Sequence, residues 1–281
     1  LSGQGSDELF GGYRVHMYGQ IAEKLARQPE WFRRAASSSV DALPSIARRL
    51  PGRSPGLVLA AHRAGRNILD NLDLPAKQRY VANRAAYYFN IASTVDLLTP
   101  QARDEALAES PWAFHLSVLD QADGLSFFDS MLYLDYKTFL ANQNLAYSDR
   151  LSMAASVEMR LPFLDDEVAD LALRIPENVK MPRFKGKEVL RRSMAGILPD
   201  EIIRRRKAAF AAPIRSWLRS ELAPLTQDAL SDRWLTATGL FQPPAVRRLV
   251  QEHQSGQADN TYRIWTLLTF ALWYRTHISS S

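Results

Sequence analysis

Apolar residues recur every three or four positions along most of the chain, which is the spacing of helices that bury one face. Between residues 20 and 92 this pattern is interrupted at Pro29, at the segment Pro51–Gly56 and at Pro75, where we expect loops. Alternating patterns typical of strands are scarce, so the sequence predicts a mainly α fold. Further short helices are expected at residues 187–196, 198–206, 213–221, 243–254 and 260–276.

Two aspartates have environments that the pattern predicts. Asp135 lies on an apolar stripe that runs from Phe128 to Phe139 at helical spacing, so its carboxylate is expected to be buried. Pairing with a neighbouring helix or arginine is the leading interpretation, since buried acids in packed helices are usually paired for structural reasons. Asp165 precedes a predicted short helix that ends near Leu173, and its carboxylate can accept the first free amide protons of that helix.

The composition is that of a globular protein, because 46% of the 281 residues are hydrophobic and a sizeable core can form. The chain has no cysteine, which excludes disulfides, thiolate metal sites and a cysteine nucleophile. This fits a reducing compartment, and we expect a cytoplasmic protein. Apolar stretches such as residues 267–273 are far shorter than the ~20 residues of a membrane span, and no charged-then-apolar leader opens the chain, so no membrane association is expected.

Positive charge is concentrated between residues 180 and 207, a segment with ten basic and three acidic residues. The formal net charge of this segment exceeds that of the whole chain, which is +5. Such a concentration predicts a polyanion site. Aromatic side chains, on which single-stranded nucleic acids stack, are limited here to Phe184 and the nearby Phe210, so nucleotide phosphate is favoured over nucleic acid. A solvated basic face is the alternative for any single arginine.

The first thirteen residues form a glycine-rich segment, Leu-Ser-Gly-Gln-Gly-Ser-Asp-Glu-Leu-Phe-Gly-Gly-Tyr, with Asp7 and Glu8 where a helix begins. Glycines let backbone amides approach a phosphate closely, and two adjacent acids would repel that phosphate unless a divalent cation lay between them. The pattern predicts a joint site for magnesium and polyphosphate, with an aspartate-capped helix after a glycine turn as the alternative. Because Leu1 runs straight into this motif, we expect further residues upstream or a partner that supplies them.

Two more stretches carry a resemblance to a known family. Residues 148–165 read Ser-Asp-Arg-Leu-Ser-Met-Ala-Ala-Ser-Val-Glu-Met-Arg-Leu-Pro-Phe-Leu-Asp, and residues 204–213 read Arg-Arg-Arg-Lys-Ala-Ala-Phe-Ala-Ala-Pro. Together with residues 1–13 they resemble the synthetase domain of the glutamine-dependent asparagine synthetases and their amidotransferase relatives. Tyr133-Leu134-Asp135 and Lys187-Glu188-Val189-Leu190-Arg191 also fall in the expected order, whereas residues 20–125 match no motif.

The resemblance implies a fold and an activity. Residues 1–281 would be the helix-rich C-terminal part of an α/β adenine-nucleotide α-hydrolase-like (ATP pyrophosphatase) synthetase domain, with residues 1–3 as the tail of a strand. The parallel sheet, the pyrophosphate loop and the glutaminase domain would precede Leu1. A carboxylate, aspartate by default, would attack the α-phosphate of ATP in the presence of Mg²⁺, and ammonia from glutamine would displace AMP to form the amide. A homodimer is a possible assembly, and no nucleic acid is implied.

The resemblance also assigns residues by position. Lys207 would neutralise charge that develops during adenylation, Glu158 could take a proton from the attacking nitrogen, and Gln4 occupies a third catalytic position. Asp7 and Glu8 would hold and orient the metal. Contacts to ATP and pyrophosphate would come from Ser2, Gly3, Gly5, Ser6, Arg150, Arg160 and Lys187. For Glu158, an ion pair with Arg160 or Arg150 is the structural alternative.

Departures from the family pattern leave other functions open. Gln4 stands where asparagine synthetases usually have Glu or Asp, and an amide can neither act as a base nor carry negative charge. Ala209 replaces the usual glycine after the lysine. An amidotransferase of a cell-surface polysaccharide or secondary-metabolite pathway and a binding-only fragment without turnover remain alternatives. We expect the isolated chain to hydrolyse no glutamine and to adenylate nothing at a useful rate.

Overall fold

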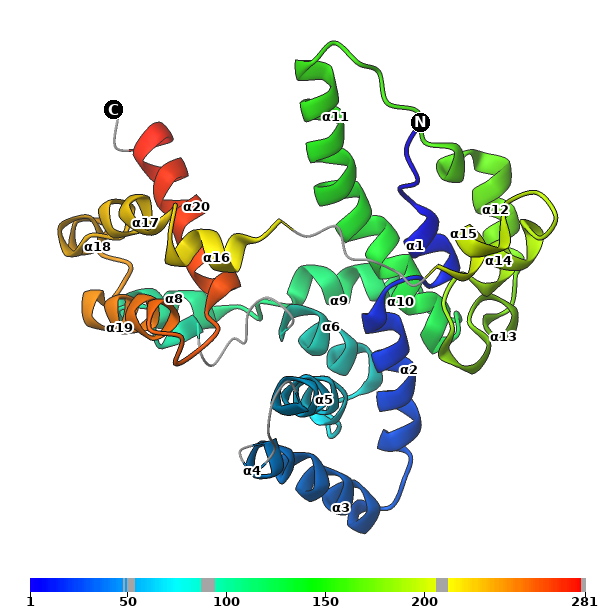
Figure 1. Cartoon of the computed structure of the whole chain (residues 1–281), viewed down its shortest axis with the longest axis horizontal. Helices are drawn as coiled ribbons and strands as arrows, with labels where there is room; N and C mark the ends of the chain where they lie inside the picture. Colours follow the sequence, from blue (N-terminus) through cyan, green and yellow to red (C-terminus); the bar gives the residue numbers. More distant parts are fainter. Residues whose placement is uncertain (48, 50–53, 87–93, 206–211, 279–281) are drawn as a thin grey trace. The chain divides into compact units, whose positions relative to one another are not determined.

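Helices form almost all of the regular structure (Figure 1). The computed structural model describes the chain except for residues 48, 50–53, 87–93, 206–211 and 279–281. Within the described part, β structure amounts to two isolated bridges, Leu98–Phe241 and Ala195–Leu198. The predicted mainly α fold is confirmed, and the implied parallel sheet is not among these residues. Residues 1–3 have no regular secondary structure here, and their place at the end of a strand of that sheet stays a prediction.

The chain divides into two compact units, a division that no shift in composition or charge marks in the sequence. Unit 1 comprises residues 1–84 and 112–206, and unit 2 comprises residues 85–111 and 207–281. The first thirteen residues and the described part of residues 148–205 all belong to unit 1. No described helix is long and apolar enough to cross a membrane.

The helices of unit 1 follow the proline positions. Pro29 immediately precedes α3 and Pro75 precedes α6, as predicted. The segment Pro51–Gly56 differs, because residues 54–56 are the first turn of α5 and residues 51–53 lie outside the described residues. Pro55 fits that turn, where the backbone N–H that proline lacks would have no partner within the helix. The helices that begin in unit 1 are α1 (Ser6–Phe10), α2 (Arg14–Ala26), α3 (Glu30–Asp41), α4 (Leu43–Ala47), α5 (Ser54–Leu69), α6 (Ala76–Ala86), α9 (Ala113–Asp120), α10 (Phe127–Asp135), the π-helix η1 (Tyr136–Leu145), α11 (Ala146–Ala154), the 3₁₀ turn η2 (Pro162–Leu164), α12 (Asp166–Arg174), α13 (Glu177–Lys180), the 3₁₀ turn η3 (Pro182–Phe184), α14 (Glu188–Ser193) and α15 (Asp200–Arg204).

A long rod made of α10, η1 and α11 runs through unit 1 without interruption (Figure 1). Its apolar face is buried as the stripe predicts, since Phe128, Met131 and Leu134 are each 1% exposed. These side chains pack with Tyr80 of α6 and Leu119 of α9 in one core cluster. Nearby, the Asp165 carboxylate accepts the Glu167 amide and caps α12, which confirms that prediction.

Asp135 is buried on this rod and is met by side chains from two other helices. Its carboxylate lies 2.9 Å from His16 Nε2 on α2, 3.1 Å from Arg84 Nε and 3.2 Å from Tyr80 Oη on α6. Burial by itself would raise the pKa of Asp135, but the hydrogen bond from His16 and the charge of Arg84 outweigh it and hold this pKa below its usual value. The predicted burial and pairing are confirmed.

Unit 2 has its own core around the last helix. Ile264, Leu267 and Ala271 of α20 are buried together with Trp234. The Trp234 ring stacks on the Phe241 ring, with 6.2 Å between the two ring centres. The helices expected at 213–221, 243–254 and 260–276 are present, while the seven-residue helices α17 and α18 were not predicted because they are too short for a clear period. The described helices of this unit are α8 (Pro100–Ala108), α16 (Ile214–Arg219), α17 (Ala223–Ala229), α18 (Asp232–Thr238), α19 (Pro243–Gln254) and α20 (Thr261–His277).

We predict that Asp135→Asn lowers the free energy of unfolding by about 3 kcal/mol at pH 7, because it leaves the Arg84 charge without its buried carboxylate. The contribution of a carboxylate whose pKa is lowered by folding is present above the unfolded pKa of about 3.9 and is lost as pH falls through the folded pKa. The deficit of the variant should therefore shrink in acid. Urea unfolding of both proteins at a series of pH values checks this.

A matched control is Glu30→Gln. The Glu30 and Arg34 side chains are 64% and 77% exposed, so loss of that pair should cost less than about 1 kcal/mol. An equal cost for both substitutions would contradict the role assigned to Asp135.

Candidate functional site

The glycine-rich segment forms a tight turn into α1. Gly5 has φ of 88°, a conformation that favours glycine, and a Cβ atom there would collide with the Leu164 side chain. Ser6 Oγ donates a hydrogen bond of 2.7 Å to the Gly3 carbonyl and closes the turn. Because Leu164 belongs to residues 148–165, the turn packs directly against the second family motif.

Lys187 brings a distant part of the chain to this turn. Its Nζ lies 3.1 Å from Asp7 Oδ2 and 2.8 Å from Ser6 Oγ, and its backbone N–H donates to the Phe10 carbonyl at 3.1 Å. The approach depends on a small residue, since a Cβ atom on Gly186 would collide with the carbonyl oxygen of Gly11. Ser6, Asp7 and Lys187, predicted from separate segments, are thus brought together.

Glu8 faces a different environment from Asp7. Its side chain is buried, accepts a 2.6 Å hydrogen bond from the Tyr13 hydroxyl and lies 3.4 Å from Asn144 Nδ2 of η1. Burial raises the pKa of Glu8, and the hydrogen bond from Tyr13 opposes that rise. Burial and the neighbouring Glu8 raise the pKa of the Tyr13 hydroxyl. Sequence reasoning missed Tyr13 and Asn144 as partners, although Tyr13 ends the first motif.

The described residues offer magnesium a limited set of protein ligands. They contain no group of three or more His, Cys, Asp or Glu side chains that could hold a metal ion. Asp7 is 21% exposed and lies beside Lys187, whereas the Glu8 carboxylate is engaged by Tyr13. A single carboxylate suits Mg²⁺ that is held largely by substrate phosphates and water, so Asp7 fits such an ion. The role of Glu8 toward a metal stays a prediction.

Gln4 contacts the second motif. Its Nε2 donates a hydrogen bond to Ser148 Oγ at 2.5 Å, and its Oε1 is buried without a hydrogen-bond partner. The Ser2 amide donates to the Arg160 carbonyl at 2.9 Å and holds the two motifs together at a second point. Ser148 was not singled out as a functional residue, and its position in the second motif was the signal that could have identified it. The amide of Gln4 therefore retains hydrogen-bonding capacity within the site.

The other predicted residues are more exposed. Glu158 and Arg160 form the ion pair expected as the structural alternative, at 3.0 Å and with side chains 69% and 71% exposed, and a catalytic role of Glu158 stays a prediction. Arg150 is exposed on α11. Gly3 has space around it, with no atom within 4 Å of the position of a Cβ. Lys207 lies outside the described residues.

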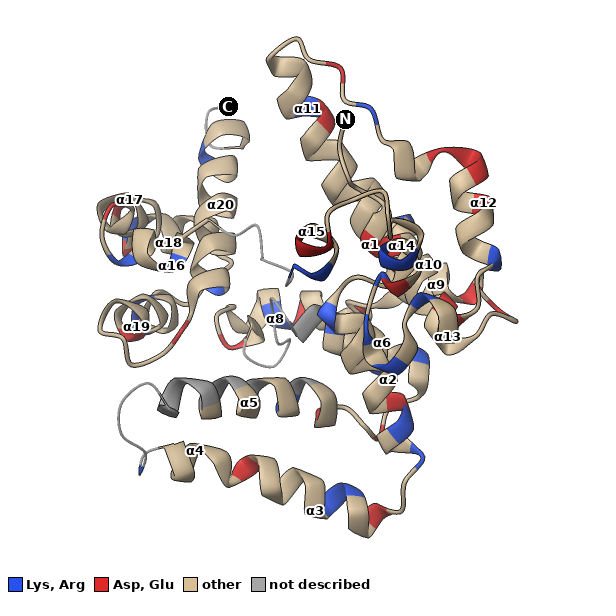
Figure 2. Cartoon of the chain, turned by 45° about the vertical axis from the view of Figure 1, so that its right-hand side comes forward, with Lys and Arg blue, Asp and Glu red and all other residues tan. Residues whose placement is uncertain are grey.

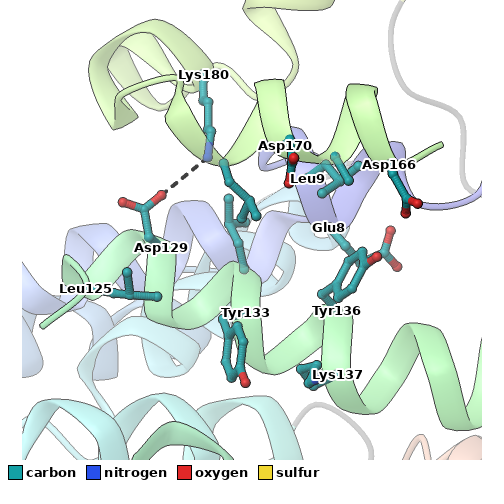
Figure 3. A pocket seen from close by; sticks show the side chains of 13 residues that line it. Glu8, Leu9, Leu125, Asp129, Tyr133, Tyr136, Lys137, Asp166, Asp170 and Lys180 are labelled. Carbon is teal, nitrogen blue, oxygen red and sulfur yellow. Dashed lines mark hydrogen bonds and ion pairs between the residues drawn. The ribbon is translucent and has the colours of Figure 1, made fainter. Parts of the chain in front are cut away.

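The basic residues of segment 180–207 have different surroundings in the fold. Lys180 is 1% exposed and pairs with Asp129 at 3.3 Å (Figure 3), so it contributes nothing to a surface for polyanions. Figure 2 shows basic and acidic residues on α14 and α15, where Arg192 pairs with Glu188 and Arg204 with Asp200. A basic cavity of about 600 Å³ lies between these two helices and includes Lys185, Arg191 and Arg205. The polyanion site stays a prediction.

We predict that Gly186→Ala destabilises the chain by about 1–3 kcal/mol, because the added methyl group meets a backbone carbonyl that cannot rotate away. Thermal unfolding measures the effect. Gly3→Ala is the matched control and should change the midpoint little, since nothing lies near its Cβ position. Equal effects of the two substitutions would show that the close approach of residues 186 and 11 carries no stability.

We also predict that Tyr13→Phe raises the pKa of Glu8 further, because it removes the hydroxyl that stabilises the ionised carboxylate. The ¹³C chemical shift of the Glu8 carboxyl group, followed over pH, measures that pKa. Tyr274→Phe removes a hydroxyl from unit 2 and should leave the Glu8 titration unchanged. An unchanged titration in Tyr13→Phe would contradict the assigned hydrogen bond.

Comparison with known proteins gives the family of this chain. The model of the asparagine synthase family matches residues 1–275. Asparagine synthetase (glutamine-hydrolyzing) 1 of Bacillus subtilis is 30% identical over 278 residues, which cover 99% of this chain and 40% of that protein. The glutamine-hydrolyzing asparagine synthetase of Mus musculus is 28% identical over 134 residues, which cover 42% of this chain and 24% of that protein.

No solved structure matches this chain significantly. The chain spans about 40% of the length of the Bacillus subtilis relative, so it corresponds to a part of that protein. The family match extends over residues 1–275, and so includes residues 20–125, which contain none of the family motifs described above. On this evidence the chain belongs to the asparagine synthase family.

Proposed function

We propose that this chain is the part of an amide-forming ligase that binds ATP and activates a carboxylic acid, with aspartate as the acid and asparagine as the product. The observation that carries the proposal is the convergence of Ser6, Asp7 and Lys187 at the glycine turn. An ammonium group with a hydroxyl at 2.8 Å and a carboxylate at 3.1 Å can hold a phosphate chain together with its divalent cation.

The side chains divide the work of adenylation. Lys187 neutralises phosphate charge, and Ser6 Oγ, which accepts a hydrogen bond from Lys187 Nζ, holds that ammonium group in place. Asp7 would hold Mg²⁺, which when bound supplies positive charge to stabilise the departing pyrophosphate. Lys207, assigned by its motif, would stabilise negative charge at the reacting phosphate, while the exposed Arg150 would bind a carboxylate or phosphate.

Proton removal during amide formation needs a group other than Gln4. The Gln4 amide is held by its hydrogen bond to Ser148, and it cannot accept the proton of the attacking nitrogen. Glu158 or water would take that proton, and Glu158 must first leave Arg160, which its 69% exposure allows at small cost. A neutral Gln4 in place of an acid is also the feature that favours a different carboxylic acid, as in an amidotransferase of a polysaccharide or secondary-metabolite pathway.

Ammonia would come from glutamine. The relatives are named as glutamine-hydrolyzing enzymes, and the regions of those proteins outside the matched part would supply the glutaminase and the remainder of the nucleotide site. A cytoplasmic location and assembly as a homodimer remain proposals of the same kind.

Pyrophosphate release from ATP and Mg²⁺ tests this function. The isolated chain should release none. Joined to the region that precedes the matched part of the Bacillus subtilis relative, it should release pyrophosphate when aspartate is added, and Lys207→Ala should lower the rate by about 100-fold or more. Lys77→Ala is the matched control, since that lysine pairs with Asp120 and Asp123 outside all three motifs.

The other outcomes separate the alternatives. Release with a different carboxylic acid, but not with aspartate, would assign the chain to the specialised amidotransferases. A folded fusion that binds ATP but releases no pyrophosphate, whichever carboxylic acid is added, would contradict the proposal and favour the binding-only fragment.

A further inference from the structure

A cavity of about 490 Å³ opens in unit 1 on the side of α1 that carries Glu8 and Leu9 (Figure 3). One wall is α12, and the opposite wall is the rod formed by α10 and η1. Leu9, Leu132 and Ala169 supply apolar surface, and Leu125 and Leu173 line it while remaining 49% and 63% exposed. The apolar lining therefore continues to solvent, where a ligand with an apolar body could enter.

The charges of the cavity are predominantly negative. Asp129 is neutralised by its ion pair with the buried Lys180. Asp166 and Asp170, one turn apart on α12, are exposed and have no ion-pair partner among the described residues, and the buried Glu8 side chain also lines the cavity (Figure 3). Lys137 is the remaining ammonium group in the lining. When all groups are ionised, carboxylates outnumber ammonium groups by two, which disfavours anions such as ATP and aspartate.

The rod adds an aromatic ring to this arrangement. Tyr136 points from the rod toward α1 and α12, whereas the Tyr133 side chain points away from α12 (Figure 3) and its hydroxyl donates to Gln121. Aromatic faces attract cations and also pack on apolar groups.

We propose that this cavity binds a small primary amine with an apolar or aromatic body. The ammonium group lies between the carboxylates of Asp166 and Asp170, and the body lies against Leu9, Leu132 and Tyr136. This site is separate from the nucleotide function proposed above, because its charge is of the opposite sign to that of the Lys187 site.

Calorimetric titration with 2-phenylethylamine tests the proposal directly on the chain, without reference to enzymatic activity. The matched neutral probe is 2-phenylethanol, and the matched anion is phenylacetate. We expect the amine to bind at least about fivefold more tightly than the alcohol, which corresponds to about 1 kcal/mol, and phenylacetate to bind more weakly than both. Equal binding of amine and alcohol, or no binding of the amine, would overturn the proposal.

Variants place the amine in the cavity. The double substitution Asp166→Asn with Asp170→Asn should weaken amine binding by about fivefold or more and leave 2-phenylethanol unaffected. Ala169→Phe should fill the cavity and remove binding of both probes. Asp104→Asn, which removes an exposed carboxylate on α8, is the control and should change neither. An amine affinity unchanged by the double substitution would refute the assigned site, even if Ala169→Phe fails to fold.

Competition gives an independent readout. ATP and aspartate should not compete with the amine. Competition by ATP would show that the amine occupies the nucleotide site and would refute a separate cavity, whatever the outcome of the pyrophosphate assay.

Discussion

The buried carboxylate of Asp135 imposes the strongest constraint on unit 1. A charge taken out of water is tolerated only when hydrogen bonds and an opposite charge replace hydration. Here those partners come from His16 on α2 and from Tyr80 and Arg84 on α6, so three helices distant in sequence must meet at one point. The apolar side chains that surround this point add contact area, but the carboxylate fixes which residues face it.

The same constraint extends to the candidate site through Tyr13. Arg84, which neutralises Asp135, lies with its guanidinium carbon 5.6 Å from the centre of the Tyr13 ring, and the ring of His16 lies 5.4 Å from it. The Tyr13 hydroxyl in turn bonds to Glu8 on α1. The charged core thus supports the ring that orients Glu8, whose carboxylate belongs both to the first family motif and to the acidic cavity.

The position of a charged residue in the fold of unit 1 decides what its side chain contacts, and the number of like charges around it in the sequence does not. Lys180 and Lys187 lie seven residues apart in one basic stretch, yet one is buried against Asp129 and the other reaches Asp7 and Ser6. The acidic cavity and the Lys187 site lie on either side of α1, since Asp7 and Glu8 point to different partners. Adjacent acids on a short helix can therefore serve two chemically distinct surfaces.

The sequence by itself determined the mainly α fold, the burial of Asp135, the cap at Asp165 and the family, because helical period, capping chemistry and motif spacing are local properties. It could not give the two-unit division, the short helices α17 and α18 or the partners of Glu8. Nor could it show that Ser6 and Asp7 meet Lys187. Those features depend on which distant surfaces pack together, and the close approach of Gly186 to Gly11 is a property of two backbones that no single segment encodes.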